Sequence, residues 1–157
     1  MTVVGADHGG VELKDTLAAA LRERGEEVFD AGTRGTDSVD YPDFARAVAG
    51  RVSRGEAERG ILVCTNGVGM SIAANKYPGV RAALVANATA ARMAREHNDA
   101  NVLVLGGGMT ATFHACELLR VFLDTPFAGG RHQRRVDRIA EIERELGLRR
   151  ERGGALR

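Results

Sequence analysis

Cys64 is the residue of this sequence best placed to do chemistry. It ends an apolar run without polar alternation, 60–63, and a short loop with Gly67 and Gly69 follows it. Such a run is typical of a parallel strand that is buried on both faces. The residues after Gly69 suit a helix, so backbone N–H groups should gather near the thiol at the start of that helix. A thiolate is stabilised there and can act as a nucleophile or as a general base.

The loop Thr65–Gly69 has two interpretations of its own. It is suited to hold an oxyanion or a phosphate, or it is only a tight turn that needs glycine. It is neither a P-loop, because no Gly-Lys-Ser/Thr follows, nor a GxGxxG dinucleotide fingerprint. The plain alternative for Cys64 is an inert buried cysteine.

Three other groups carry side chains that bind anions or move protons. Asp7 and His8 follow the first predicted strand, and His97-Asn98 stands in a predicted polar turn between a helix and a strand. Arg131 and Arg135, four residues apart, share one face of the last predicted helix, and together with His132 they suit a phosphate. The alternatives are structural histidines, a helix cap and a solvated helix face.

The elements that must position these side chains alternate regularly. Five short apolar segments are predicted as strands: 2–5, 27–31, 60–64, 80–84 and 102–105. Segments of helical periodicity separate them. This order predicts a three-layer α/β/α sandwich around a five-stranded, mainly parallel, Rossmann-like sheet. Ligands bind beyond the carboxyl ends of such strands, so Asp7, Cys64 and the glycine triplet 106–108 should meet at one edge. We expect one domain, residues 1–146, and an arginine-rich tail, 147–157.

Composition narrows the class of protein. Hydrophobic residues make up 44% and charged residues 27%, as in a soluble globular protein. No membrane-length apolar run or signal segment is evident, and the two cysteines form no CxxC pair, which predicts a cytoplasmic protein. His114 and Cys116 point to different sides of a helix, so no metal site is predicted.

The charge is uneven along the chain. The formal net charge is +1, but residues 131–157 hold nine arginines against five acidic residues. This excess favours a small anionic ligand or a solvated helix face. Nucleic-acid binding is not predicted, because the basic tail has no interleaved aromatic residues.

Taken together, these motifs resemble the type B ribose-5-phosphate isomerases, which are grouped with galactose-6-phosphate isomerase subunits. The resemblance covers about residues 3–143 and rests on five motifs in order: GADH at 5–8, DYPDF at 40–44, GVGMSIAANK at 67–76, HNDAN at 97–101 and GGRH at 129–132. It implies an aldose–ketose isomerase that acts on a phosphorylated sugar without a metal or organic cofactor. It also implies a homodimer or homotetramer whose active sites combine residues from two subunits.

The resemblance also implies a role for each candidate residue. Cys64 would be the base that moves the proton between C1 and C2, and His97, helped by Asp7, would open the sugar ring. The loop N–H groups at Asn66, Gly67, Val68 and Gly69 would hold the enediolate oxygen. The remaining residues would bind substrate: His8, Arg131 and Arg135 at the phosphate, Tyr41, Thr65 and Asn98 along the sugar.

Two positions depart from the family's pattern. Cys-Gly-Thr-Gly is usual where this chain has Cys64-Thr65-Asn66-Gly67, and many members carry an arginine where Gly108 stands. The function expected is isomerisation of ribose 5-phosphate and ribulose 5-phosphate. Two alternatives stay open at this point: the same reaction on allose or galactose 6-phosphate, and a non-catalytic module that binds a nucleotide or phosphate.

Overall fold

One parallel sheet forms the centre of the molecule. The structure is a computed structural model that describes residues 1–148. The strands pair in the order β2-β1-β3-β5-β4, all parallel. In chain order they are β1 (Thr2–Ala6), β2 (Val28–Asp30), β3 (Arg59–Cys64), β4 (Ala82–Leu84) and β5 (Val102–Gly106). The candidate cysteine therefore ends the central strand.

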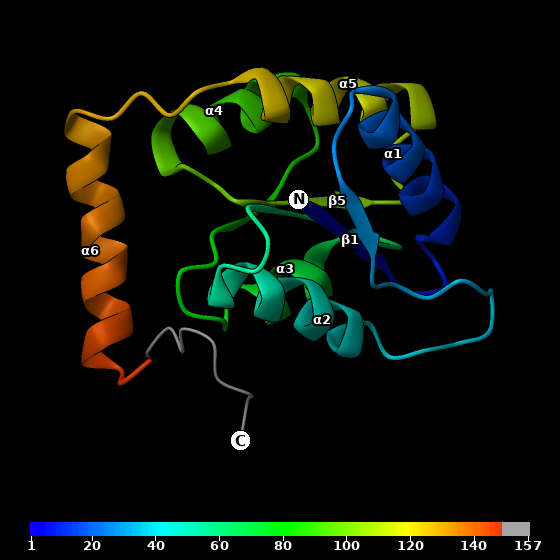
Figure 1. The fold of residues 1–157 in the computed structure, drawn as a ribbon, viewed down its shortest axis with the longest axis horizontal. Coiled ribbons are helices and arrows are strands. Elements are labelled where there is room, and N and C mark those ends of the chain that lie inside the picture. The colour runs from blue at the N-terminus through cyan, green and yellow to red at the C-terminus, as the bar shows by residue number, and fades with distance from the viewer. Residues whose placement is uncertain (149–157) are drawn as a thin grey trace.

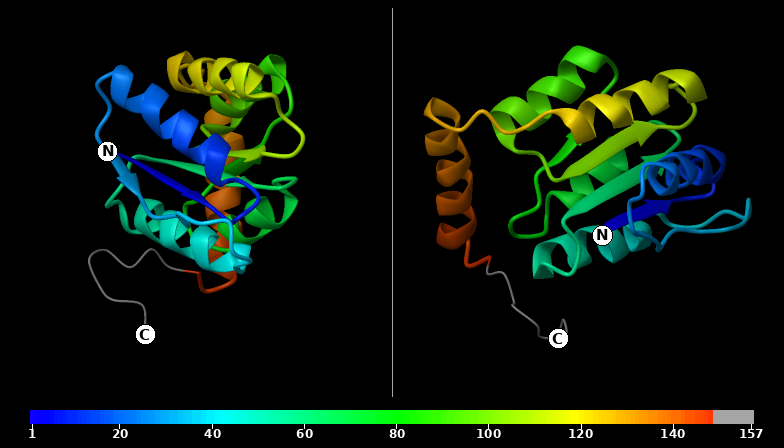
Figure 2. Two further views of the ribbon diagram at one scale, coloured as in Figure 1. Left: turned by 90° about the vertical axis from the view of Figure 1, so that its right-hand side faces the viewer. Right: turned by 45° about the horizontal axis from the view of Figure 1, so that its top comes forward.

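Helices cover both faces of the sheet (Figure 1). One face carries α1 (Val11–Glu23), α4 (Ala88–Asn98) and α5 (Thr112–Asp124), and the other carries α2 (Tyr41–Arg54) and α3 (Val68–Ala74). The last helix, α6 (Arg131–Glu145), stands outside these layers, on the left of Figure 1, and contacts α4. The left view of Figure 2 shows helices on both sides of the sheet, and the right view shows α6 apart from these layers.

The alternation of side chains along β3 explains its unbroken apolar sequence. Ile61 and Val63 pack in the core beneath α1, α4 and α5, whereas Leu62 and Cys64 pack in the core against α2 and α3. All four side chains are buried. A strand with helices on both faces needs apolar residues at every position, which confirms the interpretation of this run.

The three-layer sandwich is confirmed, with corrections to element boundaries. β2 is shorter than the predicted 27–31, and β4 begins at residue 82, since Val80 is held in a turn by its N–H to the Tyr77 carbonyl. Within residues 1–148 no helix combines the length and hydropathy that a bilayer crossing requires. The predicted tail lies, from position 149 onward, outside the described residues.

A buried ion pair fastens α1 to the edge of the sheet. The side chain of Lys14 is fully buried, and its Nζ donates to Asp30 Oδ2 at 2.6 Å. Its other carboxylate neighbour, Asp15 at 2.8 Å, is 61% exposed, so Asp30 is the partner that is shielded from water. A buried ammonium is tolerated only while it stays paired.

Removing Asp30 should therefore destabilise the fold more than removing both charges. We expect Asp30→Ala to lower the free energy of unfolding by about 3 kcal/mol, because the buried Lys14 then keeps only the exposed Asp15 as a partner. The double variant Lys14→Met/Asp30→Ala should recover much of that loss. Urea unfolding followed by circular dichroism measures both, and an equal loss in the single and double variants would contradict this account.

Candidate active site

The end of β3 places the Cys64 thiol against the loop that follows it. Cys64 is only 5% exposed, and its Sγ accepts a hydrogen bond from the Gly67 N–H at 3.1 Å. Gly67 has φ +78°, a left-handed conformation that glycine adopts without strain and that turns the chain into α3. A backbone donor therefore points at the sulfur atom of Cys64.

The other N–H groups of the loop are only partly available to a ligand. The Val68 N–H donates to Asn66 Oδ1 at 3.0 Å, so this side-chain oxygen is occupied and the Asn66 amide nitrogen is the group able to donate. Gly69 and Met70 follow in the first turn of α3. The N–H groups in the first turn of a helix have no carbonyl partner within that helix. A candidate oxyanion site thus consists of these two N–H groups and the Asn66 side chain.

Tyr41 packs directly on this loop from the start of α2. A Cβ atom added to Gly69 would lie 2.6 Å from the Tyr41 ring, so only glycine allows the ring this close. Tyr41 remains 40% exposed. An aromatic edge with a hydroxyl group therefore stands beside the candidate oxyanion site.

Asp7 and His8 reach the same edge of the sheet from β1. The Asp7 N–H donates to the Val63 carbonyl at 3.3 Å, which joins the end of β1 to the end of β3. The Asp7 carboxylate is mostly buried and accepts the Gly9 N–H at 3.0 Å. The exposed His8 ring accepts the Val39 N–H at its Nδ1, 3.2 Å away, which leaves Nε2–H to donate to an anion. The predicted convergence at this edge is confirmed.

The loop after β5 lies at the same edge of the sheet and contacts the loop after Cys64. The N–H groups of Gly107 and Gly108 donate to the carbonyls of Cys64 and Thr65, at 2.7 and 2.9 Å. A Cβ atom on Gly108 would lie 3.3 Å from Thr65 Cγ2. Thr65 and Gly108, where this chain departs from the pattern of the family it resembles, are therefore neighbours.

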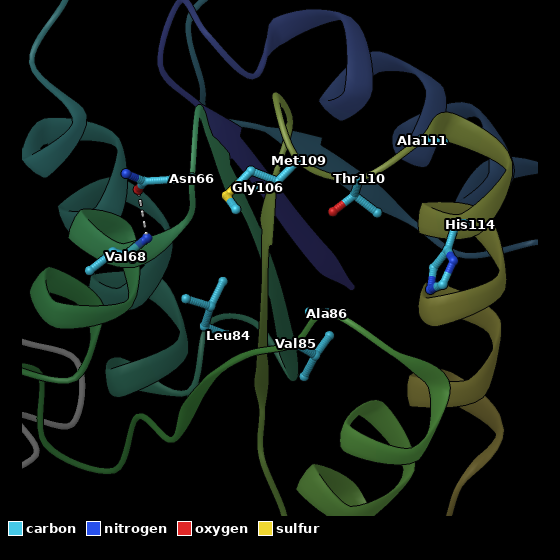
Figure 3. A pocket seen from close by; sticks show the side chains of 10 residues that line it. All are labelled: Asn66, Val68, Leu84, Val85, Ala86, Gly106, Met109, Thr110, Ala111 and His114. Carbon is cyan, nitrogen blue, oxygen red and sulfur yellow. Dashed lines mark hydrogen bonds between the residues drawn. The ribbon is translucent and has the colours of Figure 1, made fainter.

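Two hollows flank the Cys64 loop. One, of about 320 Å³, lies between Asn66 and α5 (Figure 3) and is mainly apolar: Val68, Leu84, Val85, Met109, Ala111 and His114 are among its lining residues. The other, of about 470 Å³, is more polar and is lined by His8, Gly9, Glu12, Asp15, Thr36 and Gly107. Sequence reasoning did not identify Met109, Thr110 or His114 as lining residues, because no motif surrounds them.

The remaining candidate residues form a second group on α4 and α6. His97 and Asn98 occupy the last turn of α4, which corrects the prediction of a polar turn after Glu96. The helix extends through Asn98 because its cap is Asp99, which has φ +46° and pairs with Arg95 at 2.9 Å. Arg131 and Arg135 lie exposed on the first turns of α6. Sequence periodicity alone did not reveal this extension of the helix by two residues.

The two groups lie at opposite ends of the sheet. His97 and Asn98 lead into Asn101, whose carbonyl accepts the N–H of Gly60 near the start of β3, whereas Cys64 ends that strand. Four residues of extended strand span about 13 Å. Asn98 lines a separate hollow between β4 and α6, which shares no residue with the two beside the Cys64 loop. A single chain therefore does not combine Cys64 and His97 in one pocket.

His132, next to Arg131, is closely tied to His97. The two imidazole rings stack with centroids 4.2 Å apart and planes 5° from parallel. Burial lowers the pKa of the His132 ring below its ordinary value of 6.5. The positive charges of His97, Arg131 and Arg135 lower this pKa further. The carboxylate of Glu96 raises it. His132 is therefore held in its neutral form.

Residues 1–148 offer no evident metal site. No group of three or more His, Cys, Asp or Glu side chains in this part of the chain could hold a metal ion. His114 and Cys116, which sequence reasoning rejected as a pair of ligands, belong to no such group. The site's chemistry is that of a thiol, imidazoles, carboxylates, guanidinium groups and backbone N–H donors.

Fold and site together define a class: Rossmann-like α/β proteins with a thiol at the carboxyl end of the central parallel strand. A family model described as Ribose/Galactose Isomerase matches residues 2–139. Ribose-5-phosphate isomerase B of Escherichia coli (strain K12) is 45% identical over 139 residues, 88% of this chain and 93% of that protein. The chain belongs to the ribose/galactose isomerase family.

Solved structures support the same assignment. A structure described as ribose-5-phosphate isomerase B of Clostridium thermocellum superposes with a TM-score of 0.91 at 50% identity, covering 93% of this chain and 99% of that one. Ribose-5-phosphate isomerase B from Mycoplasma genitalium, with bound ribulose-5-phosphate, superposes with a TM-score of 0.89 at 40% identity, covering 92% and 96%. The similarity therefore extends over nearly the whole described fold.

The lowered pKa of His132 predicts a pH dependence of stability. The unfolded chain takes up a proton at this ring near pH 6.5, before the folded chain does, so stability is present above that pH and is lost below it. We expect Tm to fall between about pH 7.5 and about pH 5.5 more steeply in the wild type than in His132→Phe, which cannot titrate there. Parallel Tm curves for the two proteins would contradict this cause.

Proposed function

We propose that this protein is an aldose–ketose isomerase that interconverts ribose 5-phosphate and ribulose 5-phosphate. The observation that carries the proposal is the Cys64 thiol, which ends the central strand with a backbone N–H directed at its sulfur. Two relatives favour this substrate over other phosphorylated sugars: the ribose-5-phosphate isomerase B of Escherichia coli, and the relative of 40% identity with ribulose-5-phosphate bound. The non-catalytic nucleotide-binding alternative gains no support from either.

Cys64 would act as a proton-transfer base rather than as a covalent nucleophile. As thiolate it takes the proton from C2 of the open aldose, and the electron pair moves to O1, which gives an enediolate. The proton on O2 then passes to O1, Cys64 returns its proton to C1, and the electron pair left on O2 forms the ketone, so the reaction consumes no oxidant or reductant. The charge on oxygen would be met by the N–H groups of Gly69 and Met70 and by the Asn66 amide.

The other groups would bind and open the sugar. His97 would take the proton of the anomeric hydroxyl and return one to the ring oxygen as the C1–O bond breaks, with Asp7 orienting the sugar. His8 Nε2–H, Arg131 and Arg135 would hold the phosphate, whose charge also offsets the repulsion between those arginines and the start of α6. Tyr41, Thr65, Gly67, Val68 and Asn98 would line the sugar.

This assignment requires a homo-oligomer, because within one chain His97 and Cys64 lie at opposite ends of the sheet. Exposed apolar side chains of α3, Val68 and Ile72, continue directly from the Cys64 loop. A groove of about 480 Å³ beside Asn98 offers a matching surface, lined by Val80, Ala82, Ala83, Ile139, Ile142 and Leu146. Seating α3 of one subunit in the groove of its partner would bring the Cys64 loop of the first to the His97 of the second.

The proposed base also bears on the compartment in which the reaction takes place. Both cysteines in the chain are free, and a base of this kind must stay reduced. We therefore assign the reaction to the cytoplasm. The partners expected are the phosphorylated sugar and further copies of the chain.

A six-carbon sugar phosphate remains a second candidate because of Gly108. This position carries no side chain at the edge of the site, beside Thr65, and a shorter residue there leaves room at one end of the substrate. A panel of ribose, allose and galactose phosphates separates the candidates by kcat/KM. The highest value with a six-carbon sugar would overturn the five-carbon assignment but not the reaction.

Loss of the thiol tests the base. We expect Cys64→Ala to lower kcat with ribose 5-phosphate by about 10³-fold or more, since general base catalysis contributes this much, with KM little changed. The matched control is Cys116→Ala, which removes the other free thiol and should retain full activity. Comparable activity of Cys64→Ala and the wild type would show that another group removes the proton.

Subunit complementation tests the shared site. Cys64→Ala and His97→Ala should each be inactive, but a mixture that is unfolded and refolded together should regain about a quarter of the wild-type activity, because half of the dimers then carry one intact site. Each variant refolded alone serves as the control. Recovery no greater than in these controls would mean that both residues act within one chain.

A further inference from the structure

The stacked pair of imidazoles assigns a role to His132. We infer that His132 is a positioning residue for ring opening: its buried ring stacks on His97 and fixes the plane in which the His97 imidazole meets the sugar. This inference rests on the proposed isomerase function and adds to it a residue that touches neither the thiol nor the site of proton transfer at C1 and C2.

Backbone contacts hold the two rings in this arrangement. The Ala128 N–H donates to the Glu96 carbonyl at 3.0 Å, which ties the segment before α6 to the last turn of α4. The His132 N–H donates to the Gly129 carbonyl at 2.9 Å. His132 is 7% exposed, whereas His97 is half-buried, so the ring of His132 forms a fixed floor and His97 faces outward.

Hydrogen bonding indicates how the His132 ring is protonated. Its Nε2 accepts from Arg131 Nε at 3.4 Å, which leaves the single proton of the neutral ring on Nδ1. Nδ1 is buried and has no hydrogen-bond partner among the described residues. A second proton would have to displace the Arg131 contact and would add charge beside two arginines.

The groups around His132 support the same distribution of charge. Positive neighbours come from both elements packed on it, His97 on α4 and Arg131 and Arg135 on α6, and Glu96 is the opposing carboxylate. With positive groups on both sides the His132 ring stays neutral, so its role is to support the His97 ring rather than to take up a proton itself.

The chemistry of the two substrates allows ring opening to be separated from proton transfer. Ribose 5-phosphate is mainly a ring and must be opened. Ribulose 5-phosphate is acyclic, because the oxygen that would close a five-membered ring on C2 carries the phosphate. Deuterium uptake from D₂O at C1 of ribulose 5-phosphate therefore needs Cys64 but not ring opening.

The test compares two replacements of similar bulk, His132→Leu without a planar ring and His132→Phe with one. Leucine should slow isomerisation of ribose 5-phosphate by about tenfold or more, as expected for a misplaced catalytic group, while deuterium exchange into ribulose 5-phosphate changes less than about threefold. Phenylalanine should keep both rates within about threefold of the wild type. Gln133→Ala, at the exposed neighbouring position, is the control.

Each other outcome overturns the inference. An unchanged ratio of isomerisation to exchange in His132→Leu, including an equal loss of both rates or a variant that does not fold, means that His132 serves only the structure. An equal fall of the ratio with leucine and phenylalanine means that the stacked ring is not what positions His97. If the wild type itself neither isomerises nor exchanges, the proposed function fails instead.

Discussion

The parallel direction of all five strands is the constraint on which the site depends. It gathers the carboxyl ends of β1, β3 and β5 at one edge, where the Asp7 N–H donates to the Val63 carbonyl and the Gly107 N–H donates to the Cys64 carbonyl. The same constraint makes each helix return to the opposite edge before the next strand begins. The end of α4, with His97, therefore lies away from the thiol for a topological reason that no side-chain movement relieves.

The separation of Cys64 and His97 within one chain gives a reason for two exposed apolar surfaces. The apolar groove between β4 and α6, and the exposed side chains on α3, are surfaces that a monomer would leave in contact with water. Each adjoins one half of the candidate site. An assembly of copies that covers both surfaces would also unite Cys64, His97 and the α6 arginines, as the proposed reaction requires.

The sequence predicted the fold well because its signals were local. Unbroken apolar runs specified buried strands, and the glycines at 67 and 69 marked the turn that holds Cys64. The sequence did not show that His97 extends α4, since the Asp99 cap and its ion pair form only in the folded chain. Nor did it show the hollow lined by Met109 and His114, or the contact between Thr65 and Gly108, because these arise from loops packed together across the sheet.

A crystal structure of the protein with bound ribulose 5-phosphate tests the central claim most directly. The account predicts Sγ of Cys64 within about 3.5 Å of the C1–C2 unit, as proton transfer requires, with the His97 imidazole of another subunit at the sugar and the phosphate between His8 and the two α6 arginines. A sugar bound with its C1–C2 unit away from Cys64, or approached by His97 of the same chain, would contradict it.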